Sequence, residues 1–293
     1  MIKKARLTWL DVPLLLMLML GCGWLLYRAN AQVSYQWNWS VLPQYLYRFD
    51  EASGKWLPGL ITQGVFTTLR LSLWSTILAF VFGTGMGLLR TGRSRFGRMM
   101  GWGYVEIIRN IPVLVWIFIF YYFISDQLVR AIPVDDYLRN APEAIQSTVS
   151  FLVAGPSQIS VFLSGIVALA VYEGAYVTEI IRAGIQSVDK GQWEASSALG
   201  LSRLQQMRYV IFPQAFRTIL PPLAGQFIST IKDSAIVSVI SIQELTFQGM
   251  ELMAATFMTF EVWITIMALY FLICLSCSLS IERLERFLKR KTA

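Results

Sequence analysis

The chain has 293 residues, of which 55% are hydrophobic and only 15% are charged. Soluble domains carry about 25% charged residues, so this composition, with a mean hydropathy of +0.53, excludes a soluble globular fold and predicts an all-α integral membrane protein. The formal net charge of +7 does not predict nucleic-acid binding, because the basic residues cluster at the ends of apolar runs.

The first 58 residues form a segment of their own in this prediction. A short basic stretch precedes an apolar run, 12–27, which we interpret as a retained membrane helix. A cleaved signal peptide is the alternative, because Ala29, Asn30 and Ala31 resemble a cleavage site. Residues 30–58 are polar and rich in Trp and Tyr, so we expect them outside the membrane core and partly at its surface.

Five further apolar runs predict membrane-spanning helices at 60–89, 104–125, 159–181, 216–242 and 262–281. The first of these contains Gly83, Gly85 and Gly87, which permit close packing of helices. A basic loop follows at 90–98. Its Gly92-x4-Gly97 spacing lacks the Lys-Ser/Thr of a phosphate loop, so we predict no ATP site.

The cysteines do not indicate a catalytic or metal site. Cys22, Cys274 and Cys277 all lie within apolar runs, and the chain has no histidine and no second cysteine pair. We interpret the cysteines as packing residues. We therefore expect no cofactor, no metal and no enzymatic activity in this chain.

The stretch 184–213 is polar and amphipathic, and it lies between two apolar runs. Residues 193–199 and 201–211 each show the spacing of a short helix. Gly200 between them is predicted to be a left-handed cap, and Pro213 suits the first turn of the next helix. Such a helix–turn–helix on the inner face of a membrane protein is expected to bind a soluble partner.

Basic residues predict the orientation of the chain. Lysines and arginines are abundant in 1–11, 90–98, 182–217 and 282–293 and sparse in the remaining polar segments, including 126–158. Because basic residues are enriched on the cytoplasmic side, both termini and the 184–213 loop are predicted to be cytoplasmic. Cleavage of the first run would leave the other five helices in the same orientation.

Charged residues within apolar runs predict a solute path. A charge at the bilayer centre costs about 2.5–3.5 kcal/mol, so such a group needs a protein or water-filled surrounding. We expect the path to be lined by charged and polar groups that can meet both ends of a zwitterion. These are Arg70, Glu173, Lys232, Asp233 and Ser234. The alternative is that Lys232–Asp233 forms an internal ion pair that fixes helix packing, and for Glu179–Arg182 this is the favoured reading.

Two adjacent prolines predict an interruption in the run 216–242. Pro221 and Pro222 remove helix hydrogen bonds, so we expect a broken helix and a hinge between the 184–213 loop and the solute path. A static kink is the alternative.

Several motifs resemble known permeases. Glu194-Ala195-Ser196, Gly200 and the closing Val210-x-Phe212-Pro213 resemble the EAA loop of importer permeases of the ATP-binding-cassette class, with Ser196 in place of the usual third alanine. The motifs beginning at Arg109, Ala175, Pro213 and Ile231 resemble the polar amino acid permease family, and within it the glutamate/aspartate type.

This resemblance implies a five-helix type I permease core at 59–290, preceded by an N-terminal helix, in the bacterial inner membrane. It implies a transport subunit for a polar amino acid, with ATP hydrolysis on partner chains. The implied partners are two cytoplasmic ATP-binding subunits, an external solute-binding protein and a second permease copy or paralogue. The residues that would couple the loop to the ATPase are Gly191, Gln192, Glu194, Ala195, Ser196, Leu199 and Gly200.

Three other classes of protein are consistent with parts of the sequence. An ion-gradient-driven secondary transporter or channel for small polar solutes explains the charged path but not the loop. A membrane enzyme lacks catalytic groups here, and a membrane scaffold leaves Lys232 and Asp233 unexplained.

Overall fold

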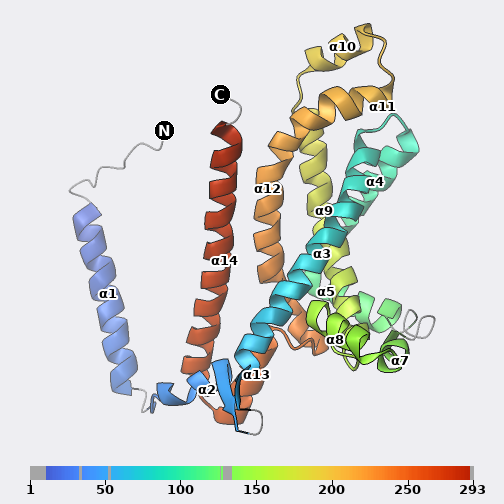
Figure 1. Cartoon of the computed structure of the whole chain (residues 1–293). Helices are drawn as coiled ribbons and strands as arrows, with labels where there is room; N and C mark the ends of the chain where they lie inside the picture. Colours follow the sequence, from blue (N-terminus) through green and yellow to red (C-terminus); the bar gives the residue numbers. More distant parts are fainter. Residues whose placement is uncertain (1–10, 33–34, 52–53, 126, 128–133, 291–293) are drawn as a thin grey trace. The chain divides into compact units, whose positions relative to one another are not determined.

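A computed structural model describes residues 11–32, 35–51, 54–125, 127 and 134–290. The chain forms two compact units, Met1–Ser40 and Val41–Ala293, and Figure 1 shows their elements. The first unit contains α1 (Asp11–Gln32), which covers the predicted run 12–27. The predicted division of the chain into 1–58 and 59–290 stays a prediction, and the basic residues Lys3, Lys4 and Arg6 lie outside the described residues.

Residues 39–58 fold into small elements that the sequence did not suggest. A 3-10 turn, η1 (Trp39–Val41), and α2 (Pro43–Leu46) precede two antiparallel strands, β1 (Tyr47–Asp50) and β2 (Lys55–Pro58). Tyr47 pairs with Pro58 and Asp50 with Lys55. Gly54 has a φ of +64 in the tight connection between the strands, a conformation that glycine adopts without steric cost.

Four helical stretches among the described residues are long and apolar enough to cross a membrane. They are α3 (Leu60–Thr91), α9 (Ile159–Gln186), the stretch Arg203–Ile240, and the part Thr259–Arg283 of α14 (Thr259–Arg290). A fifth is counted if the bent pair Arg95–Arg109 and Val113–Phe123 makes one span. With the bent pair counted as one span, these confirm the five predicted runs after residue 58. The apolar helix in α1, Asp11–Gly21, is shorter than these spans and is not counted among them.

The run 104–125 is not one straight helix, contrary to the prediction. Helix α4 (Arg95–Arg109) and helix α5 (Val113–Ile119), which continues as η2 (Phe120–Ser125), are bent by 105°. Pro112 disfavours helical geometry at the residue before it, and it stands directly before α5. The predicted basic loop 90–98 is also shorter than expected, because Ser94 caps α4 by accepting a hydrogen bond from the Gly97 N–H at 3.2 Å.

The helix around Pro221 and Pro222 is not broken, again contrary to the prediction. Both prolines lie inside α12 (Phe212–Asp233). Membrane helices tolerate internal proline because neighbouring groups satisfy the freed backbone carbonyls. Their role as a hinge stays a prediction. Helix α12 continues directly into a 3-10 segment, η4 (Ser234–Ile240), which is followed by α13 (Leu245–Thr256).

Helices α3 and α9 pack closely along their length. A Cβ on Gly83 would lie 2.7 Å from the Gly174 carbonyl oxygen, and one on Gly87 would lie 2.8 Å from Ile181. These two glycines therefore confirm the predicted close packing. Gly85 does not take part, because nothing lies within 4 Å of its added Cβ.

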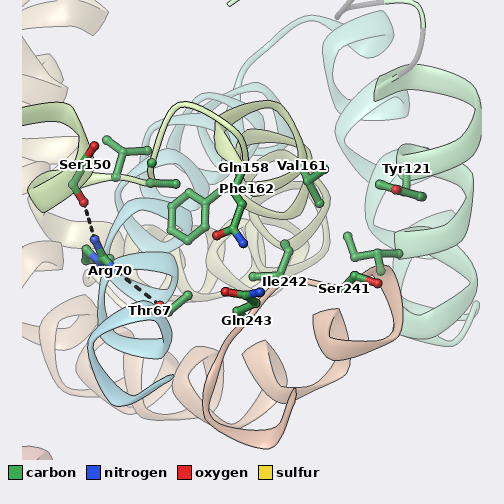
Figure 2. A pocket seen from close by; sticks show the side chains of 14 residues that line it. Thr67, Arg70, Tyr121, Ser150, Gln158, Val161, Phe162, Ser241, Ile242 and Gln243 are labelled. Atoms are coloured by element: carbon green, nitrogen blue, oxygen red, sulfur yellow. Dashed lines mark hydrogen bonds between the residues drawn. The ribbon is translucent and has the colours of Figure 1, made fainter. Parts of the chain in front are cut away.

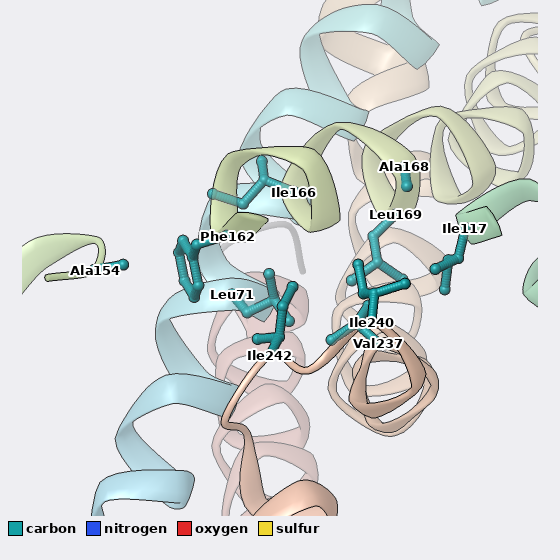
Figure 3. Packing of buried hydrophobic residues seen from close by; sticks show 10 residues of the cluster. All are labelled: Leu71, Ile117, Ala154, Phe162, Ile166, Ala168, Leu169, Val237, Ile240 and Ile242. Atoms are coloured by element: carbon teal, nitrogen blue, oxygen red, sulfur yellow. The ribbon is translucent and has the colours of Figure 1, made fainter. Parts of the chain in front are cut away.

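A buried apolar cluster joins this helix pair to α5 and η4. Figure 3 shows its side chains, with Leu71 from α3, Leu169 from α9, Ile117 from α5 and Val237 from η4 all meeting. Burial of such side chains contributes about 1.5–3 kcal/mol each. The cluster therefore fixes the end of α12–η4 against α3 and α9.

The two ends of the second unit carry different elements (Figure 1). The short helices α10 (Lys190–Ala198) and α11 (Arg203–Gln205) lie at one end. The strands, α7 (Val134–Arg139), α8 (Glu143–Leu152) and α13 lie at the other. The 184–213 loop and the described part of the polar segment, 134–158, thus occupy opposite ends, as their opposite predicted sides of the membrane require.

Candidate functional site

A buried carboxyl pair lies between α9 and the end of α12. Glu173 of α9 is fully buried. Its Oε2 accepts a hydrogen bond from the Gln226 side-chain amide of α12. The Asp233 carboxyl lies within hydrogen-bonding reach of the Glu173 carboxyl.

Aromatic and basic side chains continue this site along α9. The hydroxyl groups of Tyr172 and Tyr176 are 3.1 Å apart, and the guanidinium of Arg109 lies 4.9 Å from the centre of the Tyr176 ring. Arg109 and Tyr176, with Glu106 and Asn110, also line a cavity of about 220 Å³. Val105 and Ile108 of α4 pack against Ala175 of α9, and this contact places Arg109 beside α9.

This arrangement suits a ligand that carries both charges. Two carboxylates in a buried setting repel each other, and an opposite charge favours their ionised form. A ligand ammonium beside Glu173 and Asp233 would supply that charge. Arg109, stacked on Tyr176, is available to a ligand carboxylate, since a guanidinium binds carboxylates in a bidentate geometry.

Three of the predicted path residues do not join this site. Lys232 is exposed, and it acts electrostatically on Cys274 of α14. No carboxylate of the described residues forms a salt bridge with Lys232, so the alternative Lys232–Asp233 ion pair is also absent from them. Ser234 is buried, and its hydroxyl donates to the Ile231 carbonyl at 2.8 Å. Arg70 contacts α8 instead.

The predicted pair of Glu179 and Arg182 is confirmed as a packing feature. Arg182 Nη2 lies 2.7 Å from Glu179 Oε2, and its Nη1 donates to Gln186. Arg90 at the end of α3 forms a second salt bridge to Glu179. This network fixes α3 to α9 near the end that carries α10.

The loop helix α10 is present where the sequence predicted it. Asp189 caps it by accepting from the Gly191 N–H at 2.7 Å. Gly200 has a φ of +73, which confirms the left-handed cap, and Pro213 lies in the first turn of α12. The second loop helix differs from the prediction, because it runs from Arg203 through η3 (Gln206–Ile211) directly into α12.

Most of the predicted coupling residues are exposed on the surface. The exposed ones are Gly191, Gln192, Glu194, Ala195, Leu199 and Gly200. Ser196 differs, since only 2% of it is exposed, and its hydroxyl donates to the Trp193 carbonyl at 2.9 Å. A small residue at that position lets α10 pack closely against the rest of the unit. Ser196 therefore supports the helix and is not exposed to a partner.

Side chains from α11 and α12 hold α10 in place. The Arg203 guanidinium lies 4.1 Å from the centre of the Trp193 ring, and Gln214 Nε2 donates to Gln192 Oε1 at 3.1 Å. Leu199 and Leu204 remain 79% exposed at the tip. A firmly held helix with exposed leucines is a surface suited to binding another protein.

Known proteins match this architecture. Residues 79–293 match the family described as the inner membrane component of binding-protein-dependent transport systems. The chain belongs to this family. It is thus a permease, a multi-pass inner membrane subunit of the ATP-binding-cassette importer class whose ATPase resides on separate chains.

Several relatives of this permease are named as amino acid transport proteins. The glutamine transport system permease protein GlnP of Escherichia coli (strain K12) is 34% identical over 227 residues, or 75% of this chain and 90% of GlnP. The glutamate/aspartate import permease protein GltJ of the same strain is 33% identical over 254 residues, or 87% of this chain and 96% of GltJ. The crystal structure of an amino acid ABC transporter with histidines has a TM-score of 0.65 at 31% identity, covering 86% and 99%.

Sequence reasoning about this permease missed four residues of the central site, one of which is Arg109 at the end of α4. Gln226 lies seven residues before Asp233 in α12, and Tyr172 and Tyr176 are four residues apart in α9. Both spacings place the residues on one helix face. A search for polar residues at helical spacing from Glu173 and Asp233 would have found Tyr176 and Gln226.

A second buried carboxyl in the permease has a structural role. Glu244 stands in the connection before α13, outside the long spans, and its Oε1 accepts from the Phe247 N–H at 2.7 Å. Tyr270 donates to its Oε2 at 2.8 Å, as Thr68 does at 3.4 Å. Burial raises the pKa of the Glu244 carboxyl to about 6. All its contacts tie α3, α13 and α14 together, so Glu244 is not part of the central site.

Proposed function

We propose that this chain is the permease of an ATP-driven importer of polar amino acids, and that the solute passes Glu173 and Asp233 on its way through the membrane. The observation that carries this is the fully buried Glu173 carboxyl of α9, which accepts a hydrogen bond from Gln226 of α12 and lies beside the Asp233 carboxyl. Two buried carboxyl groups this close repel each other when both are ionised, and the ammonium of an amino acid would supply the opposite charge that the pair needs.

The charges of the site support a solute with no net negative charge. Glu173 and Asp233 are adjacent carboxyl groups, and Arg109, stacked on Tyr176, is the guanidinium of the site, with Glu106 in the same cavity as Arg109. A zwitterion such as glutamine matches this balance, whereas glutamate adds a further carboxylate that Glu173 and Asp233 repel. We therefore favour a neutral polar amino acid over glutamate or aspartate, and the named relatives include permeases for both kinds.

We further propose that α10 is the coupling helix and binds one of two cytoplasmic ATP-binding subunits. A second permease copy or paralogue completes the pore, and an external solute-binding protein delivers the amino acid. ATP must then favour one conformation of the assembly over another, because a ligand that binds two states equally shifts nothing.

Uptake by the complete transporter tests the role of Glu173. The permease, its ATP-binding subunits and its binding protein would be reconstituted in liposomes, and ATP-dependent uptake of labelled glutamine, glutamate and arginine measured. Glu173→Gln removes the charge at similar size. Loss of a hydrogen bond to a charged group is worth about 1.5–3 kcal/mol, so the half-saturating glutamine concentration should rise roughly tenfold or more.

Glu143→Gln provides the matched control, because Glu143 is exposed on α8. It should transport as the wild type does. Unchanged glutamine uptake by the Glu173→Gln transporter would contradict a solute path at this site, and preferred uptake of glutamate by the wild type would contradict the proposed solute class.

A further inference from the structure

A second polar cavity lies at the opposite end of the permease from α10. It has a volume of about 150 Å³, and α3, η2, α8, α9 and the segment after η4 contribute its lining. Each buried water needs only about 30 Å³ of liquid volume, so several waters or one small solute fit in it. It shares no residue with the cavity beside Arg109. The two are therefore separate sites on the same chain.

Arg70 brings a positive charge to this cavity. Its Nη1 donates to the carbonyl oxygens of Ser150 and Phe151 at 2.6 and 3.3 Å, and its Nη2 donates to Thr67 Oγ1 at 3.3 Å. No carboxylate among the described residues forms a salt bridge with it. The acceptors around the guanidinium are neutral carbonyl and hydroxyl oxygens, and a half-buried charge of this kind is best balanced by an anion.

Neutral donors complete the lining around this charge. Figure 2 shows the amide ends of Gln158 and Gln243 directed into the cavity from two different segments. Neither side-chain amide is hydrogen-bonded to any described residue. The lining contains no Asp or Glu, so nothing in it repels an anion. One cation beside free amide N–H groups is a suitable set of partners for a carboxylate.

Capping of α8 explains only part of this arrangement. Helix ends leave carbonyl groups unsatisfied, and Arg70 and Trp74 both donate to carbonyl oxygens near the end of α8. Neutral Trp74 shows that a cap needs no charge. The cap also leaves one Nη2 hydrogen of Arg70 and both glutamine amides without acceptors among the described residues.

We infer that this cavity binds the α-carboxylate of the transported amino acid before the solute reaches Glu173 and Asp233. The inference rests on the proposed function, since it assigns a second binding site to the same solute. Recognition here depends on the carboxylate, which all amino acids share, whereas the central site also meets the ammonium.

Equilibrium binding to the full-length permease, held with its ATP-binding subunits in lipid nanodiscs, tests this site. The probes are labelled L-glutamine and its α-carboxamide, in which a neutral amide replaces the carboxylate. The wild type should bind glutamine more tightly than the carboxamide. Arg70→Gln should weaken glutamine binding about tenfold or more and leave carboxamide binding unchanged.

Further variants separate binding from folding. Gln243→Met leaves Arg70 and the cap of α8 intact and should weaken glutamine binding severalfold. Arg70→Lys keeps the charge and should restore part of the affinity. Arg48→Gln is the control, because Arg48 is exposed on β1 at the same end of the unit, and it should bind as the wild type does.

Each contrary result has a distinct meaning. If Arg70→Gln binds both probes as the wild type does, or loses both equally, the carboxylate site is wrong. If only docking of the external binding protein weakens, the carboxylate belongs to that protein and the assignment to the solute is overturned. If the wild type binds neither probe while Arg70→Gln is equally inactive, the proposed solute class itself fails.

Discussion

Two glycines of α3 determine how closely this helix approaches α9. The added Cβ of Gly83 would meet Gly174 and Val177 at 2.7 Å, whereas that of Gly85 would meet nothing within 4 Å. Gly83→Leu should therefore destabilise the permease by about 1–3 kcal/mol through overpacking. Thermal unfolding of the purified protein in detergent measures this, and Gly85→Leu is the matched control. Equal melting temperatures for the two variants would contradict the close contact.

The sequence contained enough information to separate these glycines. Gly83 and Gly87 are four residues apart and share a helix face, while Gly85 lies between them on another. The partners of Arg70 were less accessible to such reasoning. They are backbone carbonyl groups of α8, eighty residues away in the chain, and no side-chain pattern encodes a contact to backbone.

Helix α10 presents one face to solvent and buries the other. Glu194 is exposed, and Ser196 is buried against the rest of the unit. If the exposed face binds the ATP-binding subunit, Glu194→Arg should lower ATP-dependent uptake about tenfold or more, because juxtaposed like charges cost several kcal/mol at an interface. Uptake and ATPase activity of the reconstituted transporter would be measured together.

Glu251→Arg makes the same charge change on an exposed residue of α13 at the other end of the unit, and it should leave uptake unaffected. Normal insertion with full uptake in the Glu194→Arg transporter would count against α10 as the coupling helix.

Helix positions followed from the sequence more reliably than helix breaks. Apolar length predicted α3, α9 and α14 because burial in a membrane requires it, and Gly200 predicted the end of α10. The prolines did not predict the breaks correctly. Pro221 and Pro222, where a break was expected, lie inside a continuous helix, while Pro112, where none was expected, stands at a bend of 105°. The difference depends on tertiary packing around each proline, which local sequence does not contain.

For the whole molecule, the distribution of basic residues predicts cytoplasmic termini and a cytoplasmic α10. Lys190 at the start of α10 and Lys55 in β2 lie at opposite ends of the second unit (Figure 1). In a chain whose native cysteines are replaced by alanine, Lys55→Cys should react with a membrane-impermeant maleimide in intact cells. Lys190→Cys should react only after the membrane is permeabilised, and the reverse pattern would contradict the orientation.

The unbroken stretch Arg203–Ile240 connects the neighbourhood of α10 mechanically to the central site. It begins beside Trp193 of α10 and carries Gln226 and Asp233 farther along. No loop intervenes, so a tilt imposed at the α10 end of this stretch displaces both side chains relative to Glu173. Pro221 and Pro222 lie between the two ends and leave backbone hydrogen bonds unmade. If they act as the predicted hinge, the stiffness of that turn decides how much of a movement at α10 is passed on to Gln226 and Asp233.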